Sequence, residues 1–239
     1  MSVFSKKIYC LILLFLINSS VAGATGSIEV FAIDCRTNEE RQLPEIEIFH
    51  NQHSYGAWRA KWQESWDGLT VDEQFEEGVY YIEYKSIFGK IERKKVTILN
   101  GVKQKVYLCM DKLNHKKSQI TPLIDKLKNG EKYTIQNTFR GSIDYGIESV
   151  IIKKNNGVYY AQFKKRQKRL SKKEITLLRY FEIELNLLRN RRKFCSWANE
   201  FLLSYKQNRI EIIESSCEWN GWGYLLKKLG WKAFEPKKT

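Results

Sequence analysis

Three histidines are the side chains best suited to metal binding or general base catalysis: His50, His53 and His115. His50 and His53 stand three positions apart and close to Glu45 and Glu47, so this stretch contains candidate ligands for one metal ion. A catalytic zinc site needs three protein ligands and an open position, and no HExxH or similar context is present. We therefore expect surface histidines, with no metal site and no cofactor.

Other catalytic motifs are missing from the sequence. It contains no Gly-x-Ser-x-Gly elbow, no P-loop and no GxGxxG motif. Glu182, Glu184, Glu211 and Glu214 could supply a carboxylate pair for glycoside hydrolysis, but helix and strand periodicity already explains their positions. We assign no catalytic residue and favour a protein that is not an enzyme. The alternative is a small extracytoplasmic hydrolase or metal-dependent enzyme.

Basic residues cluster at both ends of one predicted helix. Cations after a helix suit its C-terminal dipole, whereas Lys172 and Lys173 at its start do not, and this favours an anion-binding patch. The alternative is a solvated hairpin edge, where lysines discourage edge-to-edge pairing. The candidate anion-binding residues are Lys164, Lys165, Arg166, Lys168, Arg169, Arg191 and Arg192.

Trp58, Trp62 and Trp66 recur every four residues. This spacing would place the three rings on one side of a helical turn, as a candidate partner-binding face. The alternative is a short segment that covers a hydrophobic core.

The N-terminus has the pattern of a signal peptide. Lys6 and Lys7 precede an apolar run over 8–17, and the small residues of 21–24 predict cleavage after Ala24. The run of 10 residues is too short to span a bilayer, which takes roughly 20. The protein is therefore expected to be exported, periplasmic or secreted, with no transmembrane segment after cleavage.

Cleavage would remove Cys10 and leave four cysteines, which allow 3 pairings. We predict the disulfides Cys35–Cys109 and Cys195–Cys217, because each pair falls inside one predicted domain. The second pair would close the open ends of a hairpin. Zinc is disfavoured since no Cys-x-x-Cys spacing occurs.

Alternating apolar and polar residues predict strands in the first half of the chain. Asn100-Gly101 predicts a hairpin turn between the last two of them. Short strands at this spacing indicate an antiparallel β-sandwich over residues 25–113. The predicted strands are Ile28–Ile33, Ile46–Ile48, Gly78–Tyr84, Val96–Ile98 and Val102–Leu108.

This half resembles the carboxypeptidase regulatory-like, transthyretin-like sandwich domains. The matching features are Asp34, Thr37, the Pro44-Glu45-Ile46 strand start, Glu77-Gly78-Val79-Tyr80 and the closing strands over 96–108. Such domains serve as spacers or binding modules, so the resemblance implies no catalytic residue.

The second half mixes strands with one long predicted helix. Strands are expected at 133–138, 150–153 and 158–163, with a hairpin turn at 155–157. Ser171 to Glu174 form a capping box, and the helix that follows repeats Leu178, Phe181, Leu185 and Leu188 on one face. A hairpin of 201–205 and 210–213 and a short helix over 223–229 complete the prediction.

These elements predict an α+β domain over residues 123–239, joined to the sandwich by a linker at 114–122 and preceded by the signal peptide at 1–24. The overall fold class is therefore α+β. The ending Cys217-x-Trp219-x-Gly221, followed by a leucine-rich helix, resembles an uncharacterised domain of exported bacterial proteins over about 120–231. That resemblance implies no activity.

Charge sets the expected partners. The formal charge is +14, and it is +12 once Lys6 and Lys7 leave with the signal peptide. Such a field attracts anions, and outside the cytosol these are envelope components or acidic proteins rather than nucleic acid. We expect an exported, non-catalytic binding or envelope-associated protein with a basic surface.

Overall fold

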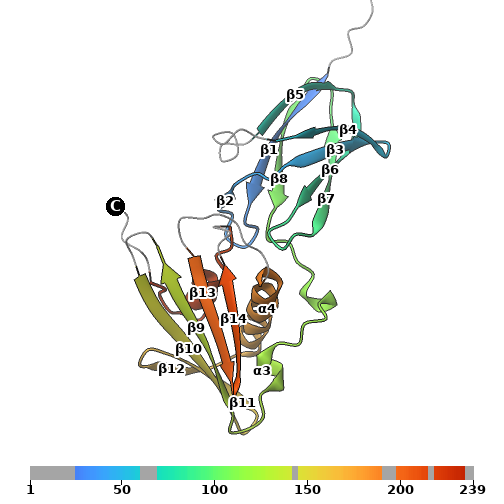
Figure 1. The fold of residues 1–239 in the computed structure, drawn as a ribbon. Coiled ribbons are helices and arrows are strands. Elements are labelled where there is room, and N and C mark those ends of the chain that lie inside the picture. Colours follow the sequence, from blue (N-terminus) through green and yellow to red (C-terminus); the bar gives the residue numbers. More distant parts are fainter. Residues whose placement is uncertain (1–24, 60–68, 142–144, 190–197, 215–217, 235–239) are drawn as a thin grey trace, which may run out of the picture. The chain divides into compact units, whose positions relative to one another are not determined.

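The computed structural model describes residues 25–59, 69–141, 145–189, 198–214 and 218–234 (Figure 1). Its strands are β1 (Gly26–Ile33), β2 (Glu40–Arg41), β3 (Ile46–His50), β4 (His53–Trp58), β5 (Leu69–Phe75), β6 (Gly78–Lys85), β7 (Ile91–Ile98), β8 (Lys103–Cys109), β9 (Lys132–Arg140), β10 (Tyr145–Asn155), β11 (Val158–Phe163), β12 (Arg166–Arg169), β13 (Ala198–Tyr205) and β14 (Asn208–Glu214). The helices are the 3-10 turn η1 (His115–Lys117), α3 (Leu123–Lys126), α4 (Lys172–Leu188) and α5 (Gly221–Lys228). None of the helices in these ranges is long and apolar enough to cross a membrane.

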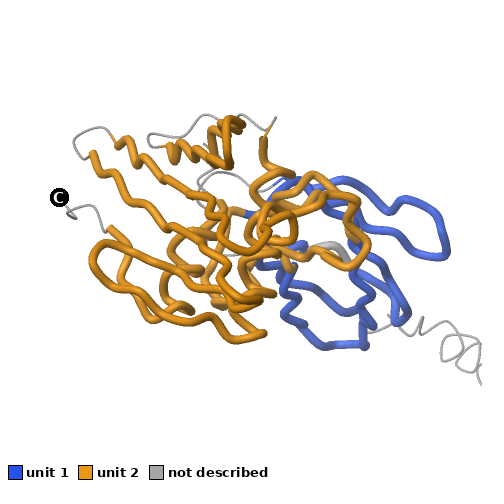
Figure 2. Tube along the Cα trace, turned by 90° about the horizontal axis from the view of Figure 1, so that it is seen from below, with its two compact units in different colours: residues 1–32, 43–84, 93–108 blue, residues 33–42, 85–92, 109–239 orange. Residues whose placement is uncertain are grey.

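The strands form three sheets. One has the order β2-β1-β5, with β8 also paired to β1; the second has the order β4-β3-β6-β7; the third has the order β12-β11-β10-β9-β13-β14. The chain divides into two compact units (Figure 2): unit 1 holds residues 1–32, 43–84 and 93–108, and unit 2 holds residues 33–42, 85–92 and 109–239. The boundaries predicted at 113 and 122 remain predictions.

Unit 1 has its core between two sheets, which are not wholly antiparallel as predicted, because the bonds from Ser27 to Val102 and from Met110 to Ile33 show that β8 runs parallel to β1. Every second residue of β1 is buried, because a period of two places alternate side chains on the core face. Phe75 of β5 packs edge-on against Tyr80 of β6, with ring centroids 5.2 Å apart. Since β5 and β6 belong to different sheets, this contact joins the two layers of the core.

The hairpin predicted across Asn100-Gly101 is wrong. The turn itself is present, with Gly101 at a φ of 70°, but β7 and β8 lie in different sheets. Ile98 and Val106, on either side of the turn, are both buried in the core. A turn sequence reverses the chain without specifying which strand becomes the hydrogen-bonding partner.

Unit 2 is organised by the six-stranded sheet. β9 pairs with β10 on one side and with β13 on the other, so Ile135 lies between Val150 and Leu203. All three side chains are buried. Helix α4 packs against the same face, where the rings of Phe181 and Phe201 lie 6.0 Å apart.

Local predictions in this half are confirmed. β10 and β11 pair across the Asn156-Gly157 turn, and β13 pairs with β14. The capping box is present: Ser171 Oγ accepts a hydrogen bond from the Glu174 backbone N–H, and the Glu174 carboxylate accepts one from the Ser171 backbone N–H at 2.8 Å. The predicted apolar face of α4 is buried.

The predicted α+β fold class, with one long helix, is wrong. Of the described residues, 50% lie in strands and 17% in helices, and the three α-helices α3, α4 and α5 have only 4, 17 and 8 residues. The Lys164-Lys165 turn folds the basic run of Arg166–Arg169 back onto β11 as a further strand, and β10 extends over 11 residues. Strands therefore dominate both halves of the chain.

Candidate functional site

A cavity of about 890 Å³ lies in unit 2. This volume is within the range of roughly 300 to 1,000 Å³ that is typical of ligand pockets. Its lining comes from the ends of β9, β10 and β13, from α5 with its flanking residues, and from the segment 36–41. The cavity thus forms where chain segments that are distant in sequence meet within one unit.

The sheet contributes a row with two polar side chains to this cavity. Next to the apolar row of Ile135, cross-strand pairing aligns Glu148, Asn137 and Phe201 on β10, β9 and β13. Because side chains alternate along a strand, this row has the same orientation as the buried apolar one. Asn137 is 4% exposed and Glu148 is 8% exposed.

Part of the hydrogen-bonding capacity of this row is unused. Glu148 Oε2 accepts a hydrogen bond from Trp222 Nε1 at 3.1 Å. Asn137 Oδ1 has no hydrogen-bond donor, and Glu148 Oε1 has only the Lys164 ammonium at 3.6 Å, an ion pair too long for a hydrogen bond. An unfilled buried acceptor costs on the order of 1 to 3 kcal/mol. Two such groups in one cavity are explained if a ligand supplies the donors.

Aromatic rings form much of the remaining wall. Trp219 and Trp222 are buried at the start of α5, whereas Phe139, Tyr224 and Phe234 stay partly accessible. The Trp219 Nε1–H donates to Glu184 Oε2 at 2.9 Å. Aromatic walls bind apolar ligand faces and leave polar groups free to provide specificity.

Gly221 is required by this packing. A Cβ atom at Gly221 would lie 2.0 Å from Trp219 Cζ2, which is far closer than atoms can approach. The Trp219-x-Gly221 spacing in the sequence therefore lets the indole ring lie against the first turn of α5.

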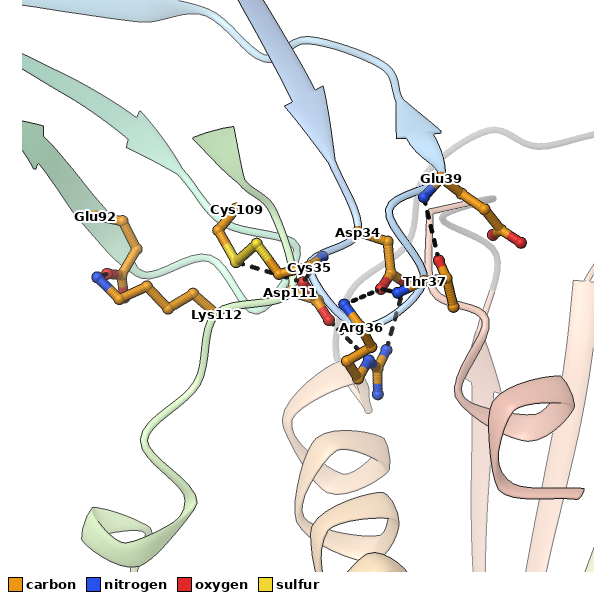
Figure 3. The surroundings of a disulfide bond; sticks show 9 residues. All are labelled: Asp34, Cys35, Arg36, Thr37, Glu39, Glu92, Cys109, Asp111 and Lys112. Carbon is orange, nitrogen blue, oxygen red and sulfur yellow. Dashed lines mark hydrogen bonds and ion pairs between the residues drawn. A yellow bond between two sulfur atoms is a disulfide. The ribbon is translucent and has the colours of Figure 1, made fainter. Parts of the chain in front are cut away.

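The disulfide Cys35–Cys109 is present as predicted, and it borders the segment that reaches the cavity (Figure 3). Asp111, two residues beyond Cys109, accepts a hydrogen bond from the Cys35 backbone N–H at 2.7 Å. The same carboxylate lies 2.7 Å from Arg36 Nε, while Arg36 Nη1 donates to Glu184 Oε2 at 2.8 Å. The bridge and this ion-pair network together fix Arg36.

The charges of this network are balanced internally. Burial lowers the pKa of Arg36, but Glu184, Asp34 and Asp111 outweigh it and raise the pKa overall. Burial also raises the pKa of Asp111, whereas the pKa of Asp34 is lowered because Arg36 and Arg41 outweigh its burial. Arg36 is therefore a structural cation more than a free anion ligand.

Glu184 is a node of the same network. His115 Nε2 lies 2.8 Å from Glu184 Oε1, and the His115 ring stacks on Tyr180 with centroids 3.9 Å apart. With Arg36 and Trp219 on its other oxygen, Glu184 is fully engaged. This predicted carboxylate is thus held as a structural group.

Cations also lie at the C-terminal end of α5. Lys227 and Lys228 are exposed and line the cavity, and Lys228 Nζ lies 5.3 Å from the Tyr224 ring centroid. Within the residues that the structure describes, neither lysine forms an ion pair with a carboxylate. These two charges are therefore available to an anion.

The structure places the predicted anion-binding residues in different surroundings. Lys164, in the turn after β11, has its Nζ 3.6 Å from Glu148 Oε1, next to the cavity. Lys168 instead pairs with Glu174 at 2.5 Å and donates to the Leu229 carbonyl at 3.1 Å. Lys165, Arg166 and Arg169 are exposed, while Arg191 and Arg192 lie outside the described residues.

Among the predicted tryptophans and histidines that the structure describes, Trp58, His50 and His53 lie in unit 1 and His115 lies in unit 2. Trp58 lies on β4 and pairs with Ile46, so it is in a strand and not in the predicted helical turn. Trp62 and Trp66 lie outside the described residues, as do Cys195 and Cys217. His50 stacks on Tyr80, with ring centroids 4.4 Å apart.

One group among the described residues has the geometry to hold a metal ion: Cys35, Cys109 and Asp111. Both cysteine sulfurs are in the disulfide, and the metal-binding form of cysteine is the free thiolate. This cluster is therefore not a metal site in the oxidised protein.

Asn137 and Glu148 were not identified from the sequence. The signal was there: each occupies an inward position in a strand whose other inward residues, such as Ile135 and Val150, are apolar. A polar break in strand alternation marks such a site, but it is found only once the register is known.

No protein-family model matches the sequence, and no curated protein matches it significantly.

Proposed function

We propose that the protein is an exported binding protein that takes an anionic ligand into the unit 2 cavity and releases it unchanged. One observation carries this proposal: an aromatic cavity is bordered by Lys227 and Lys228, which have no carboxylate partner in the described chain. The resemblance of the first half to regulatory-like sandwich domains supports a spacer role for that half.

Two features favour binding over catalysis. Glu184 is engaged by Arg36, His115 and Trp219. No histidine lines the cavity in the part of the chain that the structure describes, so the commonest general base is missing there.

Export is supported by two features. The leader over 1–24 has a basic start, an apolar run and a small-residue cleavage site. The Cys35–Cys109 bridge fits an oxidising compartment. Mass spectrometry of the native protein should find an N-terminus at Thr25; an intact leader would contradict export.

The binding experiment uses the mature chain and calorimetric titration with polygalacturonate, heparin, polyphosphate and poly-glutamate, with dextran as the uncharged probe. At least one anionic probe should bind, and its affinity should fall between about 0.05 M and 0.5 M salt because exposed charges are screened. The K227E/K228E variant should bind that probe at least ~10-fold more weakly.

The matched control is K94E/K95E, which reverses two adjacent exposed lysines of β7 in unit 1. It changes net charge equally and should bind like the wild type. Equal loss in both variants would reduce the effect to net charge and contradict the cavity. Shortening of a probe during incubation would show hydrolysis and overturn the non-catalytic proposal.

A further inference from the structure

Two buried acceptor atoms that line the cavity favour a ligand with hydrogen-bond donors. Asn137 Oδ1 and Glu148 Oε1, here called the acceptor pair, come from directly opposed residues of β9 and β10. Both side chains are more than nine-tenths buried and both line the cavity. A ligand that places donors here satisfies Asn137 Oδ1, which has no donor, and gives Glu148 Oε1 a hydrogen bond in addition to its 3.6 Å ion pair with Lys164.

The charged residues near the acceptor pair limit which ligand groups can donate hydrogen bonds to it. An ammonium group would suit Glu148, but Lys164 Nζ already lies 3.6 Å from the Glu148 carboxylate, and Lys227 and Lys228 repel a cationic ligand. A hydroxyl group carries no charge, donates one hydrogen bond and also accepts. The acceptor pair therefore fits a hydroxylated ligand.

The aromatic wall of the cavity limits which hydroxylated ligands can fit. Phe139 and Phe234 pack with ring centroids 5.9 Å apart, and Phe234 remains 41% exposed. Gly146 has no side chain, and a Cβ there would lie 3.1 Å from the Phe234 ring, so the bare backbone makes room for this aromatic surface. Flat apolar faces next to hydrogen-bonding groups suit a ring that carries both C–H faces and hydroxyls.

We propose that the ligand is an acidic saccharide, an inference that rests on the proposed anion-binding function. Sugar hydroxyls donate to the acceptor pair, the C–H face of a sugar ring packs on Phe139 and Phe234, and the carboxylate, sulfate or phosphate group lies near Lys227 and Lys228. The charge and the hydroxyl pattern of the ligand are thus recognised by different lining residues of one cavity.

The test is calorimetric titration of the mature chain with a galacturonic acid oligosaccharide and with its methyl ester of the same length. The acid should bind, and the ester, which keeps every sugar hydroxyl but loses the charge, should bind at least ~10-fold more weakly. Asn137→Leu removes one acceptor at similar volume and should weaken binding of the acid roughly 10-fold or more.

Gln136→Leu is the matched control, since Gln136 is the preceding residue of β9 and faces the opposite side of the sheet. It should bind like the wild type. Thermal unfolding of Asn137→Leu shows whether the fold is kept, and a midpoint equal to or above that of the wild type assigns the lost affinity to recognition. Asn137→Asp is the second variant if Asn137→Leu does not fold. It keeps the acceptors but adds a charge that repels the acid, so it should also weaken binding of the acid.

The outcomes separate this inference from the proposed function. Binding of polyphosphate or poly-glutamate that depends on Lys227 and Lys228, without binding of the acidic sugar, would overturn the saccharide and keep the anion-binding cavity. Sugar binding that Asn137→Leu leaves unchanged would overturn the role of the acceptor pair. Failure of every anionic probe would overturn both proposals.

Discussion

Glu182 shows how one buried carboxylate of α4 joins separate elements. It accepts a hydrogen bond from the Tyr133 hydroxyl at 2.5 Å, one from the Ile124 backbone N–H at 3.3 Å, and one from the Leu123 backbone N–H. It therefore ties β9 and the start of α3 to the helix. Burial raises the pKa of Glu182 to about 7, although these hydrogen bonds act in the opposite direction.

This raised pKa predicts a pH-dependent stability. The folded pKa lies above the ordinary value of 4.5, so between these values the folded state binds more protons than the unfolded state. The free energy of unfolding contributed by Glu182 should be fully present below pH 4.5 and fall by on the order of 3 kcal/mol as pH rises through 7. Urea denaturation of the wild type and of Glu182→Gln across this range measures it.

Glu182→Gln should flatten the profile because the amide does not titrate. Glu211→Gln, at an exposed position of β14, is the matched control and should keep the wild-type slope. An unchanged slope in Glu182→Gln would show that other groups cause the pH dependence.

At the scale of the elements, local signals were predictable and pairing was not. The capping box at Ser171, the turn at Asn156-Gly157 and the β13–β14 hairpin each depend on residues close in sequence, and all three formed as predicted. The turn at Asn100-Gly101 also formed, yet the partners of its strands are set by packing between distant segments. For the same reason, the pairing of β9 with β10 that places Asn137 opposite Glu148 could not be predicted from the sequence.

The cap of α4 gives a prediction at this scale. Ser171→Ala removes the acceptor of the Glu174 backbone N–H, so the free energy of unfolding should fall by about 1 kcal/mol. Lys173→Ala changes an exposed residue in the same turn and should stay within about 0.5 kcal/mol of the wild type. Chemical denaturation of the wild type, Ser171→Ala and Lys173→Ala measures these free energies of unfolding. Equal free energies for Ser171→Ala and the wild type would contradict a stabilising cap.

At the scale of the whole molecule, unit 2 is assembled from three separate segments, 33–42, 85–92 and 109–239. The Cys35–Cys109 bridge joins two of them covalently, across a sequence separation of 74. Between the same two segments, the backbone of Cys35 and the side chain of Arg36 both contact Asp111. The covalent and ionic links therefore close the same long loop.

Loss of this bridge should be costly because the loop is long. In the loop-entropy model, a closure of this length stabilises the fold by roughly 4 kcal/mol, so C35S/C109S should lower the free energy of unfolding by about that amount. Denaturation in urea measures the loss. Asp111→Asn, which weakens the ionic link but keeps the bridge, is the comparison and should lose less free energy of unfolding.

If C35S/C109S unfolds at the same urea concentration as the wild type, the ionic network alone holds the segments. If it unfolds much earlier while Asp111→Asn does not, the covalent link dominates the assembly of unit 2, and with it the position of Arg36 at the cavity.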